Sequence, residues 1–380
     1  MKNEDKSNYL YSWRYNNAFD ILVDGDDYFS SMLSEIKKAK KTILLEAYLF
    51  ESSNIATAFI NALDEAGKRG VEIIVLLDEY GSDSLSEKDK VQLQNNNIKL
   101  SLYNPVSFFQ LGKSLRRNHR KLLCIDSQIA FIGGAGITDD FSPKDNKNYW
   151  HDVMLKINGD IVNDLSHSFF SIYNRQERRK NSESSTPSEL INKSRILVSS
   201  GSERNEITRS IINHIRSSKR QVWLTSPYFI SSWKIRRALR YAASKGVDVK
   251  LLFPGAISDH KWVSYGIRRY YQRLLRAGID VYEYQPRFTH AKIILCDDWY
   301  SVGSSNLDRW NQLLNLDINI EVYDKKSRRE IQQLFSDDFS QSKLITLHKW
   351  NKRPITNQIK EWLSGVIINV LGYISRKFKR

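Results

Sequence analysis

The chain has 380 residues, 41% of them hydrophobic and 27% charged, which is typical of a folded globular protein and excludes disordered and fibrous classes. This length fits two domains of ordinary size, each able to bury its own core. Lys and Arg number 58 against 43 Asp and Glu, and the net charge of +15 indicates an anionic partner: nucleic acid, anionic lipid headgroups or a phosphorylated substrate. A basic surface that serves only solubility is the alternative.

The first half of the chain alternates segments typical of strands and helices. Apolar runs over 42–50 and 71–81 predict strands, and the amphipathic segment 55–70 between them predicts a helix. A further strand is predicted within 95–105. This order is a βαβ pattern.

The second half repeats this order, with a strand over 221–230, a helix over 234–246 and a strand over 247–255. Segment 276–286 then parallels 95–105, because its Pro and its Ile are both displaced by 181 positions. A duplication explains the match. Strands that are apolar on both faces and joined by helices predict an α/β fold with a mixed sheet flanked by helices in each half.

Segment 174–194 is polar and lacks apolar periodicity, which indicates a linker. We therefore expect an N-terminal domain over 1–175, a linker over 176–194, a second domain over 195–345 and a basic amphipathic tail over 346–380.

Two other features bear on the cellular setting. Cys124 and Cys296 lie in separate apolar runs, so neither a disulfide framework nor a metal cluster is expected, and a reducing compartment fits. The polar N-terminus lacks the apolar core of a signal peptide, and no run of about 18 apolar residues predicts a spanning helix. Membrane contact is therefore expected to be peripheral.

Each half carries one His-x-Lys-x(4)-Asp motif followed by a glycine turn. The candidate residues are His119, Lys121 and Asp126 with Gly133 and Gly134 in the first half, and His290, Lys292 and Asp297 with Gly303, Ser304, Ser305 and Asn306 in the second. One such motif is weak evidence, since spaced charged residues arise by chance. Two copies at equivalent points of a duplication are strong evidence for a site.

Strand geometry explains the spacing within the motif. Residues two apart project to the same face, so each His and its Lys point into one space. The Asp stands seven residues after the His, so in a regular strand its side chain projects to the opposite face. Asp126 and Asp297 belong to the catalytic signature, but we expect them to fix the following turn and sheet and not to touch substrate.

Facing motifs would bring two imidazoles and two ammonium groups into one pocket, which suits a phosphodiester. Lys121 and Lys292 supply fixed positive charge, and Asn306, Ser304 and the backbone amides of the glycine turns supply neutral donors. Neither a metal nor another cofactor is expected. One His attacks phosphorus to give a phosphohistidine, while the other protonates the leaving alcohol and then deprotonates the acceptor.

Each imidazole also needs a carboxylate that selects its tautomer and stabilises its cation. Asp152 and Asp317 are the candidates, because both lie in apolar, strand-like surroundings where an unpaired carboxylate is costly. Pairing of either carboxylate with an Arg is the alternative.

From about residue 19 to Asp338, the chain resembles the phospholipase D superfamily. The motif segments 118–126, 289–298 and 302–310, together with 44–50 and 75–82, look most like bacterial cardiolipin synthases without N-terminal transmembrane helices. The resemblance implies transfer of a phosphatidyl group from one phosphatidylglycerol to a second, with release of glycerol.

The resemblance also implies roles for single residues. His119 corresponds to the family's nucleophile and His290 to its general acid and base, and each motif is paired with its downstream carboxylate, Asp152 or Asp317. The family commonly has Glu where this chain has Asp317. It has Asn where this chain has Gly136, so Asn306 lacks a counterpart.

The connection from Pro105 to His119 is longer than its equivalent at 286–290, and it interleaves aromatic, apolar and basic residues: Phe108, Phe109, Leu111, Lys113, Leu115, Arg116 and Arg117. This composition favours a loop that dips into an anionic bilayer interface. A loop docked on the protein's own core is the alternative.

The tail carries apolar residues at three- and four-residue steps, which predicts one apolar stripe on a helix: Ile355, Ile359, Trp362, Leu363, Val366, Ile367, Val370, Leu371, Ile374 and Phe378. Residues 341–380 hold nine Lys or Arg and one acidic residue. A helix lying on an anionic membrane is the preferred interpretation. Packing on the protein body, or against a second copy, is the alternative.

These observations predict a peripheral enzyme at the cytoplasmic face of the bacterial membrane with phosphatidylglycerol as substrate. Three rivals remain: a hydrolase that releases phosphatidic acid, a phosphodiesterase acting on nucleic acid, and a non-enzymatic membrane scaffold. Half of the excess charge lies on the tail and no separate nucleic-acid-binding module is apparent, so nucleic acid is disfavoured. The oligomeric state is not readable.

Overall fold

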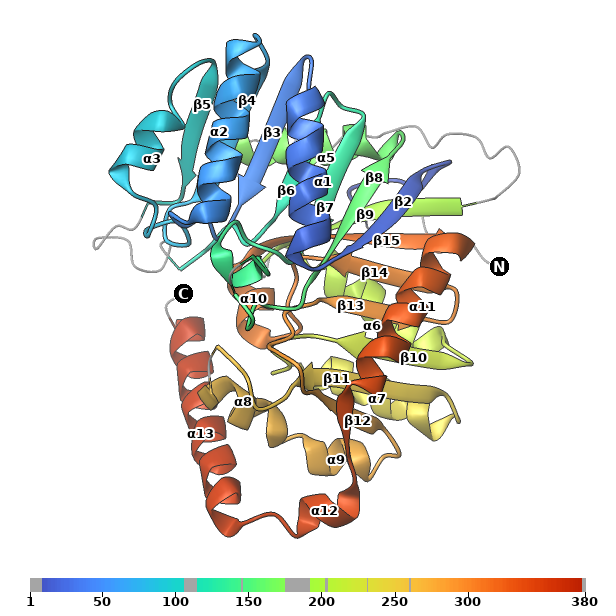
Figure 1. Ribbon diagram of the computed structural model, residues 1–380. Coiled ribbons are helices and arrows are strands. Elements are labelled where there is room, and N and C mark those ends of the chain that lie inside the picture. The colour runs from blue at the N-terminus through green and yellow to red at the C-terminus, as the bar shows by residue number, and fades with distance from the viewer. Residues whose placement is uncertain are drawn as a thin grey trace.

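The computed structural model describes residues 9–105, 115–144, 146–174, 192–201, 204–230, 232–259 and 261–377. Two mixed sheets with the same strand order form its centre (Figure 1). The first sheet has the order β2 (Ala18–Val23), β8 (Val153–Asn158), β7 (Ile129–Gly133), β6 (Leu122–Ile125), β3 (Thr42–Ala47), β4 (Glu72–Asp78) and β5 (Ile98–Tyr103).

The second sheet repeats this order with β9 (Asn192–Ser200), β15 (Leu316–Asp324), β14 (Trp299–Gly303), β13 (Ile293–Cys296), β10 (Gln221–Thr225), β11 (Asp248–Pro254) and β12 (Asp280–Tyr284). Two short strands extend it: β1 (Arg14–Tyr15) beside β9, and β16 (Ser342–Ile345) beside β12. The three strands β3, β4 and β5 are parallel, as are β10, β11 and β12. The predicted duplication and the α/β fold class are confirmed.

Helices cover both sheets. In the first half they are α1 (Asp24–Lys38), α2 (Asn54–Lys68), α3 (Glu87–Gln92) and α5 (Ile161–Tyr173), with a 3-10 turn at Asp139–Phe141. In the second half they are α6 (Glu206–Ser217), α7 (Trp233–Ser244), α8 (Lys261–Arg268), α9 (Tyr271–Leu275), α10 (Arg309–Leu314), α11 (Lys325–Ser340), α12 (Leu347–Asn351) and α13 (Ile355–Lys377). None of the described helices is long and apolar enough to cross a bilayer.

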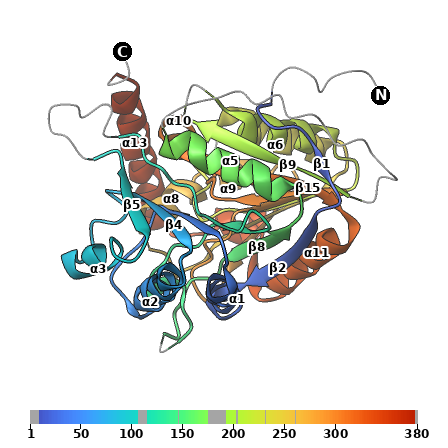
Figure 2. The same ribbon diagram turned by 90° about the horizontal axis from the view of Figure 1, so that it is seen from above.

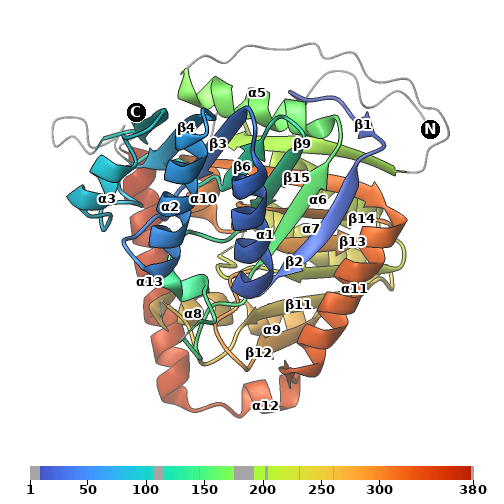
Figure 3. The same cartoon turned by 45° about the horizontal axis from the view of Figure 1, so that its top comes forward.

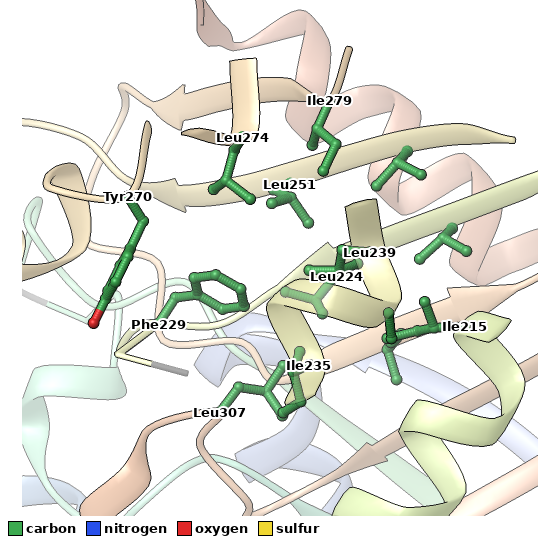
Figure 4. Close-up of a cluster of buried hydrophobic side chains, with 14 of the residues drawn as sticks. Ile215, Leu224, Phe229, Ile235, Leu239, Leu251, Tyr270, Leu274, Ile279 and Leu307 are labelled. Carbon is green, nitrogen blue, oxygen red and sulfur yellow. The ribbon is translucent and has the colours of Figure 1, made fainter. Parts of the chain in front are cut away.

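Three buried clusters define the layers. One lies between the first sheet and helices α1 and α2, which run side by side over its outer face (Figures 1 and 3). A second lies between the second sheet and helices α6 to α9. Figure 4 shows part of it, where Leu224 and Leu251 of the sheet meet Ile215, Ile235 and Leu239 of α6 and α7.

The third cluster joins the two halves. It contains the inner faces of both sheets together with side chains from α5 and α11, such as Leu165 and Phe335. Figure 2, seen from above, shows α5 and α11 on opposite sides of this junction. Because the shared core is apolar and extensive, the two halves form one body, and the loops at the ends of their central strands are fixed against each other.

Candidate active site

Each motif begins just before a central strand and is hydrogen-bonded to the other half of the chain. The backbone N–H of His119 donates to the carbonyl of Leu316 at 2.9 Å, and that of His290 donates to the carbonyl of His151 at 2.7 Å. Leu316 and His151 each stand immediately before the downstream carboxylate of their own half. Two short parallel bridges therefore place the motif of one half beside the carboxylate of the other.

The two imidazoles are paired with carboxylates across the junction. Nδ1 of His119 lies 3.0 Å from Oδ1 of Asp317, and Nδ1 of His290 lies 2.7 Å from Oδ2 of Asp152. All four side chains are buried. The resemblance implied that each motif uses the carboxylate downstream in its own half. In the structure each His instead pairs with the carboxylate of the other half, because the backbone bridges bring each motif beside the opposite segment.

Each Lys folds back onto its own motif. Nζ of Lys121 donates to the carbonyl of His119 at 2.7 Å, and Nζ of Lys292 donates to the carbonyl of His290 at 2.6 Å. Nζ of Lys292 also lies 3.1 Å from Nε2 of His290 and 3.9 Å from Oδ2 of Asp152. Burial, together with the nearby Lys292 charge, holds the pKa of Lys121 well below its ordinary value, and burial lowers the pKa of Lys292 to about 8.

The environment also sets the charge of the imidazoles. Burial and the adjacent Lys121 lower the pKa of His119 to about 4, and burial and Lys292 lower the pKa of His290 to about 3. Burial alone would raise the pKa of Asp152, but Lys292 and His290 outweigh it and lower this pKa. Both imidazoles are therefore neutral at neutral pH in the empty site, and Asp152 is ionised.

A cavity of about 400 Å³ opens over these groups. His119, Lys121, His290, Gly134 and Asn306 line its polar part. The remaining wall includes the apolar side chains of Leu49, Phe141, Trp150, Ile230, Trp262, Val263 and Leu314. Within the described ranges, no three His, Cys, Asp or Glu side chains are grouped as metal ligands would be. Asp259 and Asp308 also line the cavity, so it joins a cationic floor to a wall that is mostly apolar but carries two carboxylates.

The glycine turns differ between the halves. A Cβ atom on Gly134 would lie 2.5 Å from Oδ2 of Asp152 and 2.9 Å from Nζ of Lys292, so only glycine leaves room for both groups. The equivalent Ser304 instead donates its hydroxyl to Asp317 at 2.9 Å. A Cβ on Gly133 would similarly meet the Val153 carbonyl at 2.4 Å.

Asn306 is buried and lines the cavity, and its Oδ1 has no hydrogen-bond partner among the residues that the structure describes. Its counterpart Gly136 lines the cavity too, but packs on Leu49 and offers no side chain. The two glycine turns therefore present unequal groups to the cavity: an amide side chain from Asn306 and none from Gly136.

Asp126 and Asp297 lie at the far ends of β6 and β13, outside the cavity wall. The Asp126 carboxylate accepts backbone N–H groups from Lys40, Lys41 and Thr42 at 2.7–2.9 Å. In the same way, the Asp297 carboxylate accepts the backbone N–H groups of three residues at the start of β10, at 2.8–3.0 Å. Their place in the candidate catalytic set is corrected, since each anchors the strand next to its own hairpin.

We predict that Asp126→Asn lowers the free energy of unfolding by about 1–3 kcal/mol, because charge-assisted bonds to three amides are weakened. Thermal unfolding measures this loss. The kcat of the folded variant should stay within about threefold of the wild type, and a loss comparable with that of His119→Ala would instead indicate a role for Asp126 in the cavity.

Sequence reasoning missed the aromatic rings around His290. Ring centroids of Phe141 and Trp150 lie 5.3 Å from that of His290, and the Phe288 centroid lies 6.0 Å away. His119 meets only Tyr48 at such a distance among the described rings, at 5.0 Å. These residues come from separate loops, and no spacing in the sequence marks them as neighbours.

His151 is a second missed residue. Its Nδ1 lies 2.8 Å from Oδ1 of Asp24 and its Nε2 lies 3.3 Å from Asp338, so it joins α1 of one half to α11 of the other. Tyr284 stacks on its ring and Arg287 pairs with Asp24. Burial opposes protonation, but the two carboxylates outweigh it and raise the pKa of His151 to about 10.

We predict that His151→Leu, which installs the residue type of the equivalent Leu316, lowers the free energy of unfolding by about 3 kcal/mol near pH 6.5, because buried Asp338 loses its cation and half-buried Asp24 keeps only Arg287. The folded pKa lies above the ordinary 6.5, so this stabilisation is complete below about pH 6.5 and is lost as pH rises through about 10. The difference in melting temperature between wild type and variant should shrink over that range, and a constant difference would contradict the assignment.

The loop after Pro105 lies partly outside the described residues, which include none of Phe108, Phe109, Leu111 and Lys113. Of its described residues, Leu115 is exposed. Arg116 donates to the Ser200 carbonyl at 3.0 Å, and buried Arg117 pairs with Asp78 at 3.4 Å. The two Arg residues expected to meet lipid therefore bind the protein body.

Comparison with known proteins supports the assignment of the fold and the motifs. A family described as "Cardiolipin synthase, PLD-like domain" matches residues 32–171 and 211–340, one segment in each half. The cardiolipin synthase of Clostridium perfringens (strain 13 / Type A) is 33% identical over 97% of this chain and 79% of its own length. Cardiolipin synthase 1 of Staphylococcus epidermidis is 31% identical over 94% of this chain and 74% of its own.

Among solved structures, phosphatidylserine synthase from Haemophilus influenzae Rd KW20 superimposes with a TM-score of 0.75 over 94% of each chain at 13% identity, which shows a shared fold. The duplicated motifs, their common cavity and the similarity along nearly the whole chain agree. The chain belongs to the cardiolipin synthase family of phospholipase D-like proteins.

Proposed function

We propose that this protein is a cardiolipin synthase that transfers a phosphatidyl group from one phosphatidylglycerol to the terminal hydroxyl of a second, releasing glycerol. It would act peripherally at the cytoplasmic face of the bacterial membrane. One observation carries the proposal: His119, Lys121 and His290 line one cavity, Lys292 lies directly behind His290, and each His is held by a carboxylate of the opposite half.

In the first step, Nε2 of His119 attacks the phosphorus of the donor lipid. A P–N bond forms, the P–O bond to the glycerol headgroup breaks, and Nε2 of His290 gives its proton to the departing oxygen. Asp317 holds Nδ1 of His119 and stabilises the cation that develops there, while Asp152 does the same for His290.

In the second step, the roles reverse. The hydroxyl of the acceptor lipid loses its proton to Nε2 of His290, its oxygen bonds to phosphorus, and the P–N bond to His119 breaks. Nε2 of His290 thereby regains the proton that it gave up in the first step, and cardiolipin leaves.

Substrate charge makes this proton transfer feasible. Burial, and after it the lysine cations, depress the pKa of both imidazoles in the empty site. A bound phosphodiester brings a negative charge that offsets Lys121 and Lys292, so the pKa of the general acid rises towards neutrality only when substrate is present. The same cations stabilise the charge on the pentacoordinate phosphorus.

The apolar wall favours a lipid alcohol over water as acceptor. Phe141 and Trp150 stand beside His290, where the acceptor would lose its proton. Apolar rings at that point lower the local concentration of water and accept the glycerol and upper acyl regions of a second lipid.

The test is incubation of the purified protein with phosphatidylglycerol vesicles, without added metal, and mass spectrometry of the lipids. Cardiolipin and an equal amount of glycerol are expected, and both should be absent with His119→Ala and with His290→Ala. His348→Ala, an exposed residue of α12, is the matched control and should retain activity. Phosphatidic acid as the main product would overturn the transferase assignment in favour of a hydrolase.

A further inference from the structure

Helix α13 is docked on the protein in an unusual orientation. Every apolar side chain between Ile355 and Val366 is exposed: Ile355 71%, Ile359 51%, Trp362 67%, Leu363 48% and Val366 41%. The buried residues of the same segment are Glu361, Ser364 and Gly365. An amphipathic helix of a water-soluble body normally turns its apolar stripe inward, and this one turns it outward.

Polar contacts hold the inner face. Glu361 pairs with Arg353 at 2.9 Å, the hydroxyl of Ser364 donates to the carbonyl of Trp262 at 2.6 Å, and Gly365 packs against the guanidinium of Arg269. Helix α8, which carries Trp262, therefore has a specific seat for the polar side of α13, and the two helices lie side by side (Figures 1 and 2). Because the polar side of α13 faces the protein body, its apolar side chains face outward.

The charge around the stripe has one sign. Residues 341–380 contain nine Lys or Arg and a single acidic residue, Glu361, which is buried in its pair with Arg353. Lys349, Lys352 and Lys360 are exposed. An apolar stripe flanked by cations complements an anionic bilayer interface. It disfavours a second copy of this chain, because two such stripes would bring like charges together.

Helix α8, on which the inner face of α13 is seated, also lines the cavity. Trp262 accepts the Ser364 hydroxyl, lines the cavity and is still 47% exposed. Trp362 and Trp262 both expose their indole rings at the surface. Tryptophan side chains favour the headgroup level of a bilayer. A bilayer on α13 would therefore lie beside the opening through which lipid headgroups must pass.

We infer that the outward face of α13, formed by Ile355, Ile359, Trp362, Leu363 and Val366, is the surface that docks on an anionic lipid bilayer and sets the cavity mouth at headgroup level. The inference deepens the proposed function, but binding to lipid does not depend on catalysis. It can therefore be tested in protein that lacks the nucleophile.

The experiment measures sedimentation of the His119→Ala protein with vesicles of phosphatidylglycerol and phosphatidylcholine, or of phosphatidylcholine alone. Binding is expected to the anionic vesicles, and adding Trp362→Glu should weaken it at least tenfold. Tyr241→Glu, an exposed aromatic residue of α7 given the same charge, is the matched control and should bind like its parent. With the native His119, Trp362→Glu should lose activity on vesicles and keep its kcat on a monomeric short-chain phosphatidylglycerol.

Two results would overturn the inference. One is vesicle binding that Trp362→Glu leaves unchanged. The other is a wild-type dimer in analytical ultracentrifugation that Trp362→Glu converts to a monomer, which would make the stripe a self-association surface. Loss of all transfer with normal vesicle binding would instead count against the proposed function alone.

Discussion

His290→Ala is expected to release about one equivalent of p-nitrophenolate per active site from phosphatidyl-p-nitrophenol and then to stop. This leaving group departs without a proton, so attack by His119 no longer needs a general acid. The second step still needs a base for the acceptor hydroxyl, and without His290 it should slow by roughly 10⁴-fold. The phosphatidyl group then remains on His119, and peptide mass spectrometry should find it there.

His119→Ala is the matched variant. It should give neither the burst nor the adduct, because no nucleophile remains, while wild type turns over continuously. Both imidazoles are buried, neutral and bound to a carboxylate, so geometry alone leaves the two steps interchangeable. A burst with His119→Ala and an adduct on His290 would exchange the two roles.

Much of the fold follows from local patterns in the sequence. The strand predicted over 71–81 is β4 at Glu72–Asp78, and the helix predicted over 55–70 is α2 at Asn54–Lys68. Ser53 caps this helix by accepting the N–H of Ala56, which fixes its start. The Asp297–Gly303 spacing is one residue shorter than the Asp126–Gly133 spacing, and the hairpin is tighter accordingly: Cys296 pairs with Trp299 where Ile125 pairs with Ile129. These features depend on residues close together in the sequence, so the spacing of apolar and turn residues predicts them directly.

The crossed carboxylates show where local patterns fail. Asp317 lies 198 positions from His119 in the chain, and only the packing of two sheets decides which imidazole it meets. Repetition in the sequence reveals that two equivalent sites exist, but it is symmetric and cannot distinguish pairing within a half from pairing across halves. The bridges from Asn118 to Leu316 and from His151 to Thr289, which join the two halves, fix the pairing across them.

The tail shows a similar limit. Its periodicity predicts the helix that the structure contains as α13, but the pattern does not state which side faces the body. The seat on α8 depends on Ser364, Gly365 and Glu361, which are ordinary residues for the polar side of any helix. Which face of an amphipathic helix packs on the protein therefore depends on tertiary contacts with the surface against which it lies.

Replacing Lys292, the lysine next to His290, is expected to have the second large effect on kcat. Lys292→Met should lower kcat roughly 10³-fold, because a buried cation that stabilises the transferring phosphoryl group is removed. Lys121→Met should cause a loss of similar size, since Lys121 lines the cavity beside His119. Lys99→Met, which removes an exposed surface cation, is the control and should leave kcat unchanged.

The pH dependence separates the two lysines. Burial sets the pKa of Lys292 to about 8, so the free enzyme holds this cation below pH 8 and loses it above. Wild-type kcat/KM should therefore fall as pH rises through about 8. The residual activity of Lys292→Met should lack this fall, whereas that of Lys121→Met should keep a fall at the same or a higher pH, because loss of the neighbouring Lys121 charge can only favour the Lys292 cation. An alkaline fall near pH 8 that survives in Lys292→Met would assign it to another group and would leave Lys292 a role in folding the site, not in carrying charge to phosphorus.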